Sequence, residues 1–226
     1  MRVLDLATTN LEGLKPDDLE AVRSAAADAG CNLTNLKMNQ PGLDLGSRDN
    51  GKRDRSLSSY RKSIDDAARL GMQWARPLPT KNPPENDTLF LDGMRQLAEY
   101  ADEKGLTLLI ENYGWMERSS RSIVELVEAI DAPVAASPDT GNWVSNEIRY
   151  EGLSLSFPIA VTCDFKVKTL GPDLSHAAYD LERCFRMGAA ARFRGPWCIE
   201  HGHRDRTTLF RELSWIRDQM REWDRT

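Results

Sequence analysis

Four short apolar runs in this chain each end at or beside an acidic residue, and this repeated feature constrains the fold most strongly. The clearest run is Leu106–Ile110, which is followed directly by Glu111. The other runs carry Asp139 after PVAASP, Asp164 within VTCDFK, and Glu200 after PWCI. Acidic residues are unfavourable in strands, and burying an uncompensated charge costs free energy. The repeated acids therefore indicate a functional requirement at the ends of the predicted strands.

Segments with helical periodicity alternate with predicted strands along the whole chain. Glycines at positions 30, 71 and 105 follow three of the expected helices, which is a common way for a helix to end. Helices are expected over residues 16–29, 57–70, 87–104, 122–130, 146–156, 177–190 and 207–223, and residues 39–55 are expected to form a long polar loop. Strands that alternate with helices in this way indicate parallel βαβ units.

The alternation predicts an α/β fold of the TIM-type (β/α) barrel class. No glycine-rich phosphate loop follows a predicted strand, which disfavours a dinucleotide-binding sheet. Acids at the carboxyl ends of successive strands are typical of barrel active sites. Seven strand–helix units are visible in 226 residues, whereas a complete barrel has eight units in roughly 250 residues. We therefore expect a single domain, residues 1–226, that lacks the first βα unit of a full barrel.

The period-two alternation of a strand predicts where the acidic side chains point. Around Asp164 the apolar residues fall on one face, and Asp164 and Lys166 fall on the other. The same alternation places Glu111, Asp139 and Glu200 on the face that is expected to line the barrel axis. Four neighbouring carboxylates cannot all be ionised without compensation, and a divalent cation such as Mn²⁺ or Mg²⁺ suits all-oxygen ligands. The alternative is that each acid pairs with a basic side chain of its own.

Four stretches together resemble the xylose-isomerase-like α/β barrels, the sugar (phosphate) isomerase and epimerase superfamily. They are IENYG (110–114), PDTGNW (138–143), CDFKVK (163–168) and GPWCIEHG (195–202), and the resemblance extends from about residue 3 to the C-terminus. It implies one divalent metal ion held by Glu111, Asp139, Asp164 and Glu200. Mn²⁺ or Mg²⁺ is favoured as this ion, and Co²⁺ and Zn²⁺ are alternatives.

Two positions depart from the pattern of the superfamily. The ligand on the third of these strands is usually a histidine, but here it is Asp164, which makes the site more anionic and harder. Asn142 stands where many relatives place another histidine. With only three histidines, the chain cannot build the histidine-rich trinuclear zinc site of the superfamily's DNA-repair nucleases. That branch of the superfamily is therefore disfavoured.

The resemblance implies a divalent-metal-dependent isomerase or epimerase that acts on a small sugar or sugar phosphate through an enediolate intermediate. Glu111 and Glu200 would form the acid/base pair. Lys166 would stabilise the oxyanion or donate a proton, and its alternative role is to neutralise the acids. Two other functions stay open: an inosose-dehydratase-like lyase, and a catalytically inactive barrel that binds a sugar.

Several residues near the acids are candidates for binding the substrate. An arginine at a strand end suits a phosphate or carboxylate, tryptophans suit the apolar face of a sugar, and polar side chains suit its hydroxyl groups. The ordinary alternatives are structural ion pairing, core packing and loop positions without a function. The candidates are Arg76, Asn112, Trp115, Asn142, Trp143, His201 and His203.

Composition narrows the partners and the compartment. The net charge of −5 argues against nucleic acid, whose phosphates require a basic face. No apolar run is long enough to span a membrane, and no secretory signal is visible at the N-terminus. The four cysteines lack CxxC spacing and are expected to be buried free thiols in a reducing cytoplasm. The expected partner is a carbohydrate substrate, and assembly into a homo-oligomer is left open.

Overall fold

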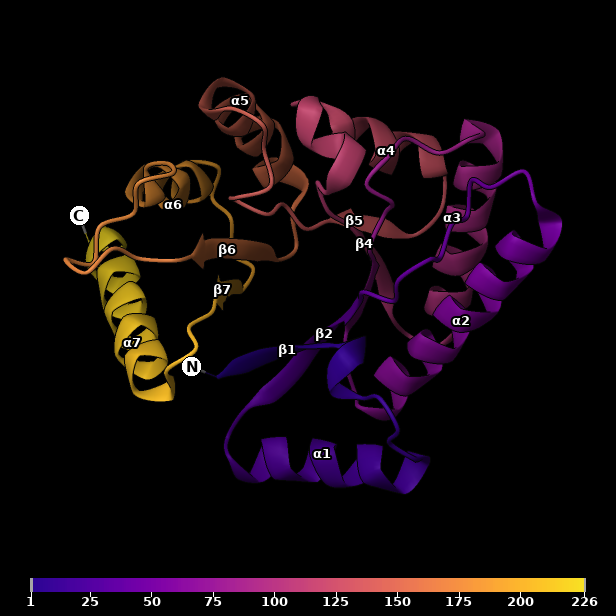
Figure 1. Cartoon of the computed structure of the whole chain (residues 1–226), viewed down its shortest axis with the longest axis horizontal. Helices are drawn as coiled ribbons and strands as arrows, with labels where there is room; N and C mark the ends of the chain where they lie inside the picture. The colour runs from indigo at the N-terminus through magenta and orange to yellow at the C-terminus, as the bar shows by residue number, and fades with distance from the viewer. Residues whose placement is uncertain (1, 226) are drawn as a thin grey trace. The chain divides into compact units, whose positions relative to one another are not determined.

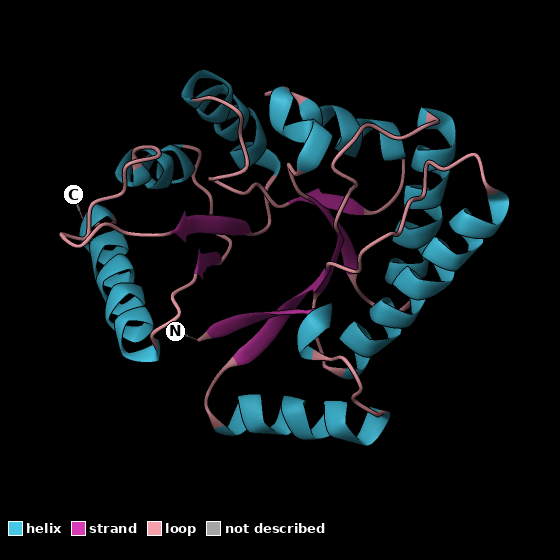
Figure 2. Cartoon of the chain, viewed as in Figure 1, coloured by secondary structure: helices cyan, strands magenta, loops and turns pink. Residues whose placement is uncertain are grey.

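The computed structural model describes residues 2–225, so the two terminal residues of the expected domain 1–226 lie outside it. Strands and helices alternate along the chain, which confirms the α/β class (Figure 2). In order, the elements are β1 (Val3–Ala7), η1 (Thr8–Asn10), α1 (Pro16–Asp28), β2 (Asn32–Met38), α2 (Asn50–Arg69), β3 (Trp74–Pro77), α3 (Asp87–Glu103), β4 (Thr107–Ile110), η2 (Gly114–Arg118), α4 (Ser122–Ile130), β5 (Val134–Ala136), α5 (Asn146–Ser156), η3 (Phe157–Ile159), β6 (Cys163–Lys168), α6 (Leu181–Ala190), β7 (Trp197–His201) and α7 (Arg206–Trp223). The seven strands and seven α-helices in residues 2–225 match the expected number of units.

The chain divides into two compact units. The N-terminal unit runs to Met116 and also contains Glu125–Ala135, and the C-terminal unit contains Glu117–Val124 and the chain from Ala136 onward. The single-domain organisation expected from the sequence stays a prediction. In the part of the chain that the structure describes, no helix is both long enough and apolar enough to cross a membrane.

The N-terminal unit is built on one sheet whose strands follow the order β1-β2-β3-β4-β5 (Figure 1). The pairs β1–β2, β2–β3 and β3–β4 are parallel, so a helix crosses back over the sheet between one strand and the next. Leu36, Ala75 and Leu108 occupy one row of this sheet and are fully buried. Lys37 and Arg76 are paired on the opposite face. The sheet therefore has an apolar face and a face that carries charged side chains.

The loop expected over residues 39–55 is wrong in its last third, because α2 begins at Asn50. Asp49 caps this helix, and its side chain accepts a hydrogen bond from the backbone N–H of Lys52 at 3.1 Å. Ser56, which directly precedes the helix expected over residues 57–70, is buried within α2. Its hydroxyl donates to the carbonyl of Lys52 at 2.8 Å and accepts from the N–H of Asp44 at 2.9 Å. Residues 50–56 of α2 contain no apolar side chain, so apolar periodicity could not reveal this part of the helix.

The helix expected over residues 177–190, in contrast, begins later than expected, at Leu181. The side chain of Asp180 accepts a hydrogen bond from the backbone N–H of Arg183 at 2.9 Å, which makes Asp180 the N-cap. Tyr179 therefore belongs to the connection between β6 and α6. The direction of its side chain is therefore not set by the periodicity of α6.

The C-terminal unit has an aromatic core beside the parallel pair β6–β7. Cys163, Phe165 and Val167 are fully buried in this core, which confirms the alternation expected for this strand. Trp197 of β7 packs edge-on against Phe165, with ring centroids 5.7 Å apart, and lies 5.0 Å from the ring of Phe185. The burial of these large apolar side chains holds β6 and β7 against the helices of the unit.

A register shift interrupts the β6–β7 pair near its carboxyl end. Lys166 pairs with Glu200, but the next pair joins Lys168 to His201, so one extra residue of β6 is accommodated. Lys168 has a φ of 65°, which is uncommon for a residue with a side chain. A β-bulge of this kind ends regular pairing and redirects side chains, and such bulges are frequent next to active sites.

The reactivity of two cysteine thiols, Cys163 and Cys184, provides a test of the burial of this core. Burial raises the pKa of Cys184 to about 12 and the pKa of Cys163 well above its ordinary value. Because the thiolate is the reactive form, we expect iodoacetamide at pH 8 to label both at least about 100-fold more slowly in the native protein than in urea. Labelling resolved by mass spectrometry checks this, with the partly exposed Cys31 as the internal reference. Equal native and denatured rates at Cys163 would contradict the described core.

Candidate functional site

Glu111, Asp139 and Glu200 lie at or just beyond the carboxyl ends of strands, whereas Asp164 lies near the start of its strand. In the N-terminal unit Glu111 directly follows β4, and its side chain is 3% exposed. In the C-terminal unit Asp164 and Glu200 lie within β6 and β7, and Asp139 follows β5 and pairs with Asp164 in an isolated bridge. Carboxyl ends of strands are where TIM barrels place their active sites. The expected position at a strand end is therefore wrong for Asp164, because β6 continues for four residues beyond it.

In the N-terminal unit, Glu111 forms a buried ion pair with Arg76. The Nε of Arg76 lies 2.7 Å from the Oε2 of Glu111, and each side chain is only 3% exposed. The Nη2 of Arg76 also donates to the Oδ1 of Asn39 at 3.2 Å. This is the structural pairing that the sequence left open for Arg76. Its role as a substrate ligand stays a prediction.

The Arg76–Glu111 pair yields a stability prediction. Removing one partner strands a buried charge, so Arg76→Met or Glu111→Leu alone should lower the free energy of unfolding by about 3 to 5 kcal/mol. The double variant removes both charges and should lose clearly less than the sum of the two single losses. Urea unfolding of the three variants measures this coupling. Additive losses would show that the two side chains do not depend on each other.

In the C-terminal unit, the ammonium group of Lys166 joins two of the acids. Its Nζ lies 2.6 Å from the Oδ2 of Asp139 and 2.8 Å from the Oε1 of Glu200, and it donates to the Oδ1 of Asn142 at 3.1 Å. Burial alone would lower the pKa of Lys166, but the charges of Asp139 and Glu200 outweigh burial and raise it above the ordinary value. Lys166 is therefore a permanent cation at neutral pH, with one acceptor for each of its three protons.

Asp139 is the most deeply buried acid of this group, with no exposed surface. Its Oδ1 accepts hydrogen bonds from the backbone N–H groups of Gly141 at 2.6 Å and Asn142 at 3.1 Å, while its Oδ2 faces Lys166. Burial raises the pKa of Asp139 to about 6 against the opposing charge of Lys166. The turn after Asp139 thus holds Oδ1 and directs Oδ2 toward Lys166.

Asp139 and Asp164 approach each other closely enough to share a cation. A carboxylate oxygen of each lies within 4.8 Å of the other, and the negative charge of Asp164 contributes to the raised pKa of Asp139. Asp139 and Glu200 thus share the ammonium group of Lys166, and Asp164 lies beside Asp139. The structure brings these three predicted ligands together within the C-terminal unit. The convergence of Glu111 with them stays a prediction.

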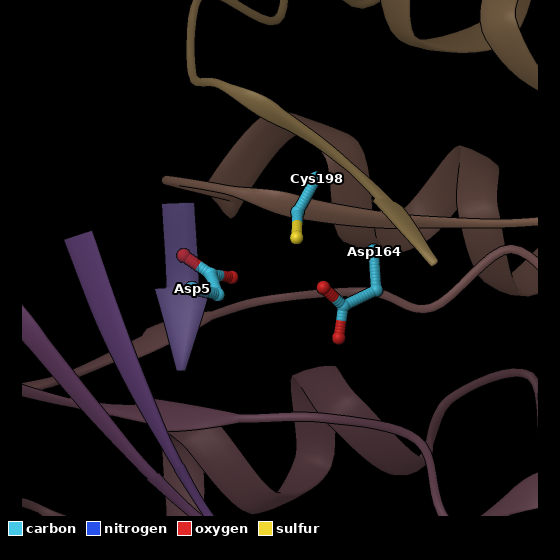
Figure 3. Close-up of side chains that lie close together, drawn as sticks. All are labelled: Asp5, Asp164 and Cys198. Carbon is cyan, nitrogen blue, oxygen red and sulfur yellow. The ribbon is translucent and has the colours of Figure 1, made fainter. Parts of the chain in front are cut away.

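Cys198 is a neighbour of this cluster that the sequence did not single out as a ligand. It pairs with Asp164 in the β6–β7 register, and its thiol lies within 4.8 Å of an Asp164 carboxylate oxygen (Figure 3). The sequence did contain an indication of this position, because period-two alternation places Cys198 on the same face as Glu200. Figure 3 also labels Asp5 of β1, whose Oδ1 accepts a hydrogen bond from the hydroxyl of Thr34 at 2.7 Å within the N-terminal unit.

Arg149 of α5 is a further residue that the sequence did not reveal. It is buried, and its Nε donates to the carbonyl of Thr140 at 2.8 Å and its Nη2 to that of Trp143 at 3.4 Å. These bonds hold the turn that carries Asp139. The signal was that Arg149 falls on the buried stripe of α5 together with Gly152, three positions later.

The two predicted tryptophans are placed differently. Trp143 is 5% exposed, packs on Gly152, and donates from its indole N–H to the carbonyl of Asp139 at 2.9 Å. Trp143 therefore stabilises the turn after Asp139 from a buried position. Trp115 lies in η2 and meets Phe90 edge-on, with ring centroids 6.3 Å apart.

The remaining candidates divide between buried and exposed positions. Asn112 is fully buried directly after Glu111. The Nε2 of His201 lies 2.7 Å from the Oε2 of Glu212 on α7, so this ring faces the helix. His203 is exposed, and its Nδ1 accepts a hydrogen bond from the backbone N–H of Asp205 at 2.9 Å. Neither histidine is among the acceptors that surround Lys166, and their binding roles stay predictions.

Comparison with known proteins identifies the architecture. A family model described as "Xylose isomerase-like TIM barrel" matches residues 3–221. No curated protein matches the sequence significantly. Among solved structures, D-psicose 3-epimerase with D-tagatose from Clostridium cellulolyticum H10 has a TM-score of 0.78 at 15% identity, over 98% of this chain and 89% of that chain.

Two further solved structures are similar to the chain. A xylose isomerase domain protein from Planctomyces limnophilus has a TM-score of 0.80 at 12% identity, over 99% of this chain and 88% of that one. A xylose isomerase-like TIM barrel protein from Mycobacterium smegmatis in complex with magnesium has a TM-score of 0.69 at 17% identity, over 99% and 85%. At these identities the similarity establishes a shared fold, and activity has to be argued from the residues of this chain.

Proposed function

The chain belongs to the xylose isomerase-like TIM barrel family, and from this premise we propose that it is a divalent-metal-dependent sugar isomerase or epimerase. The observation that carries the proposal is the cluster in the C-terminal unit. Asp139 and Asp164 lie within reach of one cation, and Lys166 ties Asp139 to Glu200. Acids concentrated at the strand ends of a TIM barrel are what a metal-assisted reaction at a sugar carbonyl requires.

The donor atoms of this cluster fit a hard divalent ion. We propose Asp139, Asp164 and Glu200 as ligands, with Glu111 of the N-terminal unit as the fourth, on the basis of its matching position in the family pattern. Carboxylate oxygens favour Mn²⁺ or Mg²⁺, and the thiol of Cys198 near Asp164 leaves Co²⁺ and Zn²⁺ as alternatives. When bound, such an ion polarises the carbonyl group of the substrate.

The residues of the chain supply the proton transfers. The side chain of Glu200 is 41% exposed, which lets it reach a sugar, and it lies beside the ammonium of Lys166. We propose that Glu200 removes a proton from the carbon next to the carbonyl, and that Glu111 acts on the opposite side. The enediolate formed in this way is stabilised by the positive charge of Lys166. Return of the proton to the other carbon of the enediolate gives isomerisation, and its return to the opposite face of the same carbon gives epimerisation.

One alternative function has a specific observation in its favour. Arg76 is paired with Glu111, and Lys166 is paired with Asp139 and Glu200, so basic side chains already offset much of the acidic charge. A barrel that binds a sugar without a metal ion and without turnover is compatible with this pairing. Metal binding to the protein separates this alternative from the enzyme.

The first experiment therefore measures metal affinity. We expect chelator-treated protein to bind about one Mn²⁺, and Asp139→Asn or Asp164→Asn to weaken binding at least about 100-fold, because each removes a charged ligand. Titration calorimetry measures both. Asp49→Asn is the matched control, because it removes an acid while keeping a residue that caps α2. A protein that binds none of Mn²⁺, Mg²⁺, Co²⁺ and Zn²⁺ at millimolar concentration would contradict the metal proposal.

The second experiment measures the reaction. With Mn²⁺ and a panel of ketoses in D₂O, we expect deuterium to enter the carbon next to the carbonyl. Glu200→Gln should lower the rate by about 10²- to 10⁴-fold while the circular dichroism spectrum is unchanged. Nuclear magnetic resonance of the products also separates epimerisation from loss of water. Full activity in thoroughly metal-stripped protein would overturn the mechanism.

A further inference from the structure

The backbone of Lys166 is held by side chains on both sides of the residue. Its N–H donates to the hydroxyl of Thr140 at 3.0 Å, and its carbonyl accepts a hydrogen bond from the hydroxyl of Tyr179. The hydroxyl groups of Thr140 and Tyr179 are themselves 3.4 Å apart. Lys166 is therefore fixed through its main chain as well as through its ammonium group.

These hydrogen bonds lie where the pairing between β6 and β7 becomes irregular. Regular pairing between β6 and β7 is interrupted directly after Lys166, and Lys168 has a left-handed backbone conformation. A strand loses positional definition at a bulge, because the regular ladder no longer determines its direction. The hydroxyl of Tyr179 meets β6 at this point and restores a fixed position for the Lys166 carbonyl.

Tyr179 is in turn held by Arg149. The guanidinium carbon of Arg149 lies 4.0 Å from the centroid of the Tyr179 ring, and both side chains are buried. A desolvated cation over an aromatic face is an attractive arrangement. Because Arg149 also binds the carbonyls of Thr140 and Trp143, it ties the turn after Asp139 to Tyr179.

We propose that Tyr179 and Arg149 are positioning residues that fix Lys166 between Asp139 and Glu200. They act through the backbone of Lys166 and through the turn that follows Asp139, and they need no contact with the substrate. The catalytic consequence rests on the proposed function, whereas the positioning of Lys166 does not. Loss of the Tyr179 hydroxyl should loosen the three bonds made by the Lys166 ammonium.

The test compares the accessibility of the Lys166 amine in three proteins. Wild type, Tyr179→Phe and Tyr100→Phe are acylated with a succinimidyl ester at one pH, and the rate at Lys166 is read by mass spectrometry. Tyr100 is the matched control, because its hydroxyl is also hydrogen-bonded, to Asp65 at 2.9 Å, and its ring also faces a cation, Lys104 at 5.0 Å. We expect about fivefold faster acylation of Lys166 in Tyr179→Phe only, the effect of one lost hydrogen bond.

A second pair of variants keeps the proposal falsifiable if Tyr179→Phe does not fold. Thr140→Val removes the acceptor of the Lys166 N–H and should also accelerate acylation, while Thr140→Ser keeps the hydroxyl and should behave as wild type. Unchanged acylation in both Tyr179→Phe and Thr140→Val would overturn the inference. Where wild type turns over D-fructose, kcat of Tyr179→Phe should fall with KM unchanged. Absence of turnover in wild type would count against the proposed function and would leave the acylation result standing.

Discussion

Charge compensation by Lys166 is the interaction on which the C-terminal unit depends. Asp139 is fully buried, and a buried carboxylate is costly unless it is paired and hydrogen-bonded. The ammonium group of Lys166 forms an ion pair with Asp139 and a second ion pair with Glu200. Because Lys166 and Glu200 pair directly across β6 and β7, the register of two strands sets the distance between the lysine and this acid.

The N-terminal unit meets the same requirement with different residues. Glu111 follows β4, and Arg76 of the neighbouring β3 lies against it, so in each unit a cation on one strand pairs with acids on or after neighbouring strands. In both units the opposite face of the sheet is apolar and packs on helices. This division lets the apolar face supply the stability while the polar face carries the charged groups.

Much of the fold was predictable from local patterns. The expected limits of α4 and α5 agree with the structure, because apolar periodicity and flanking turn residues mark both ends. The start of α2 (residues 50–56) was missed because it contains no apolar side chain. The start of α6 was placed too early because Ala177 and Ala178 favour helices without requiring one. Both errors lie at element ends, where capping by Asp49 and Asp180 decides the outcome.

The amino-acid sequence by itself determined the α/β alternation, the segments that carry the acids, and the common face of Asp164 and Lys166. These follow from period-two and helical patterns, which act over a few residues. Only the tertiary structure decided that Lys166 bridges Asp139 to Glu200, and that Arg149 meets Tyr179 thirty positions further along the chain. Such contacts depend on how helices and strands pack, and no local periodicity encodes which distant side chains then meet.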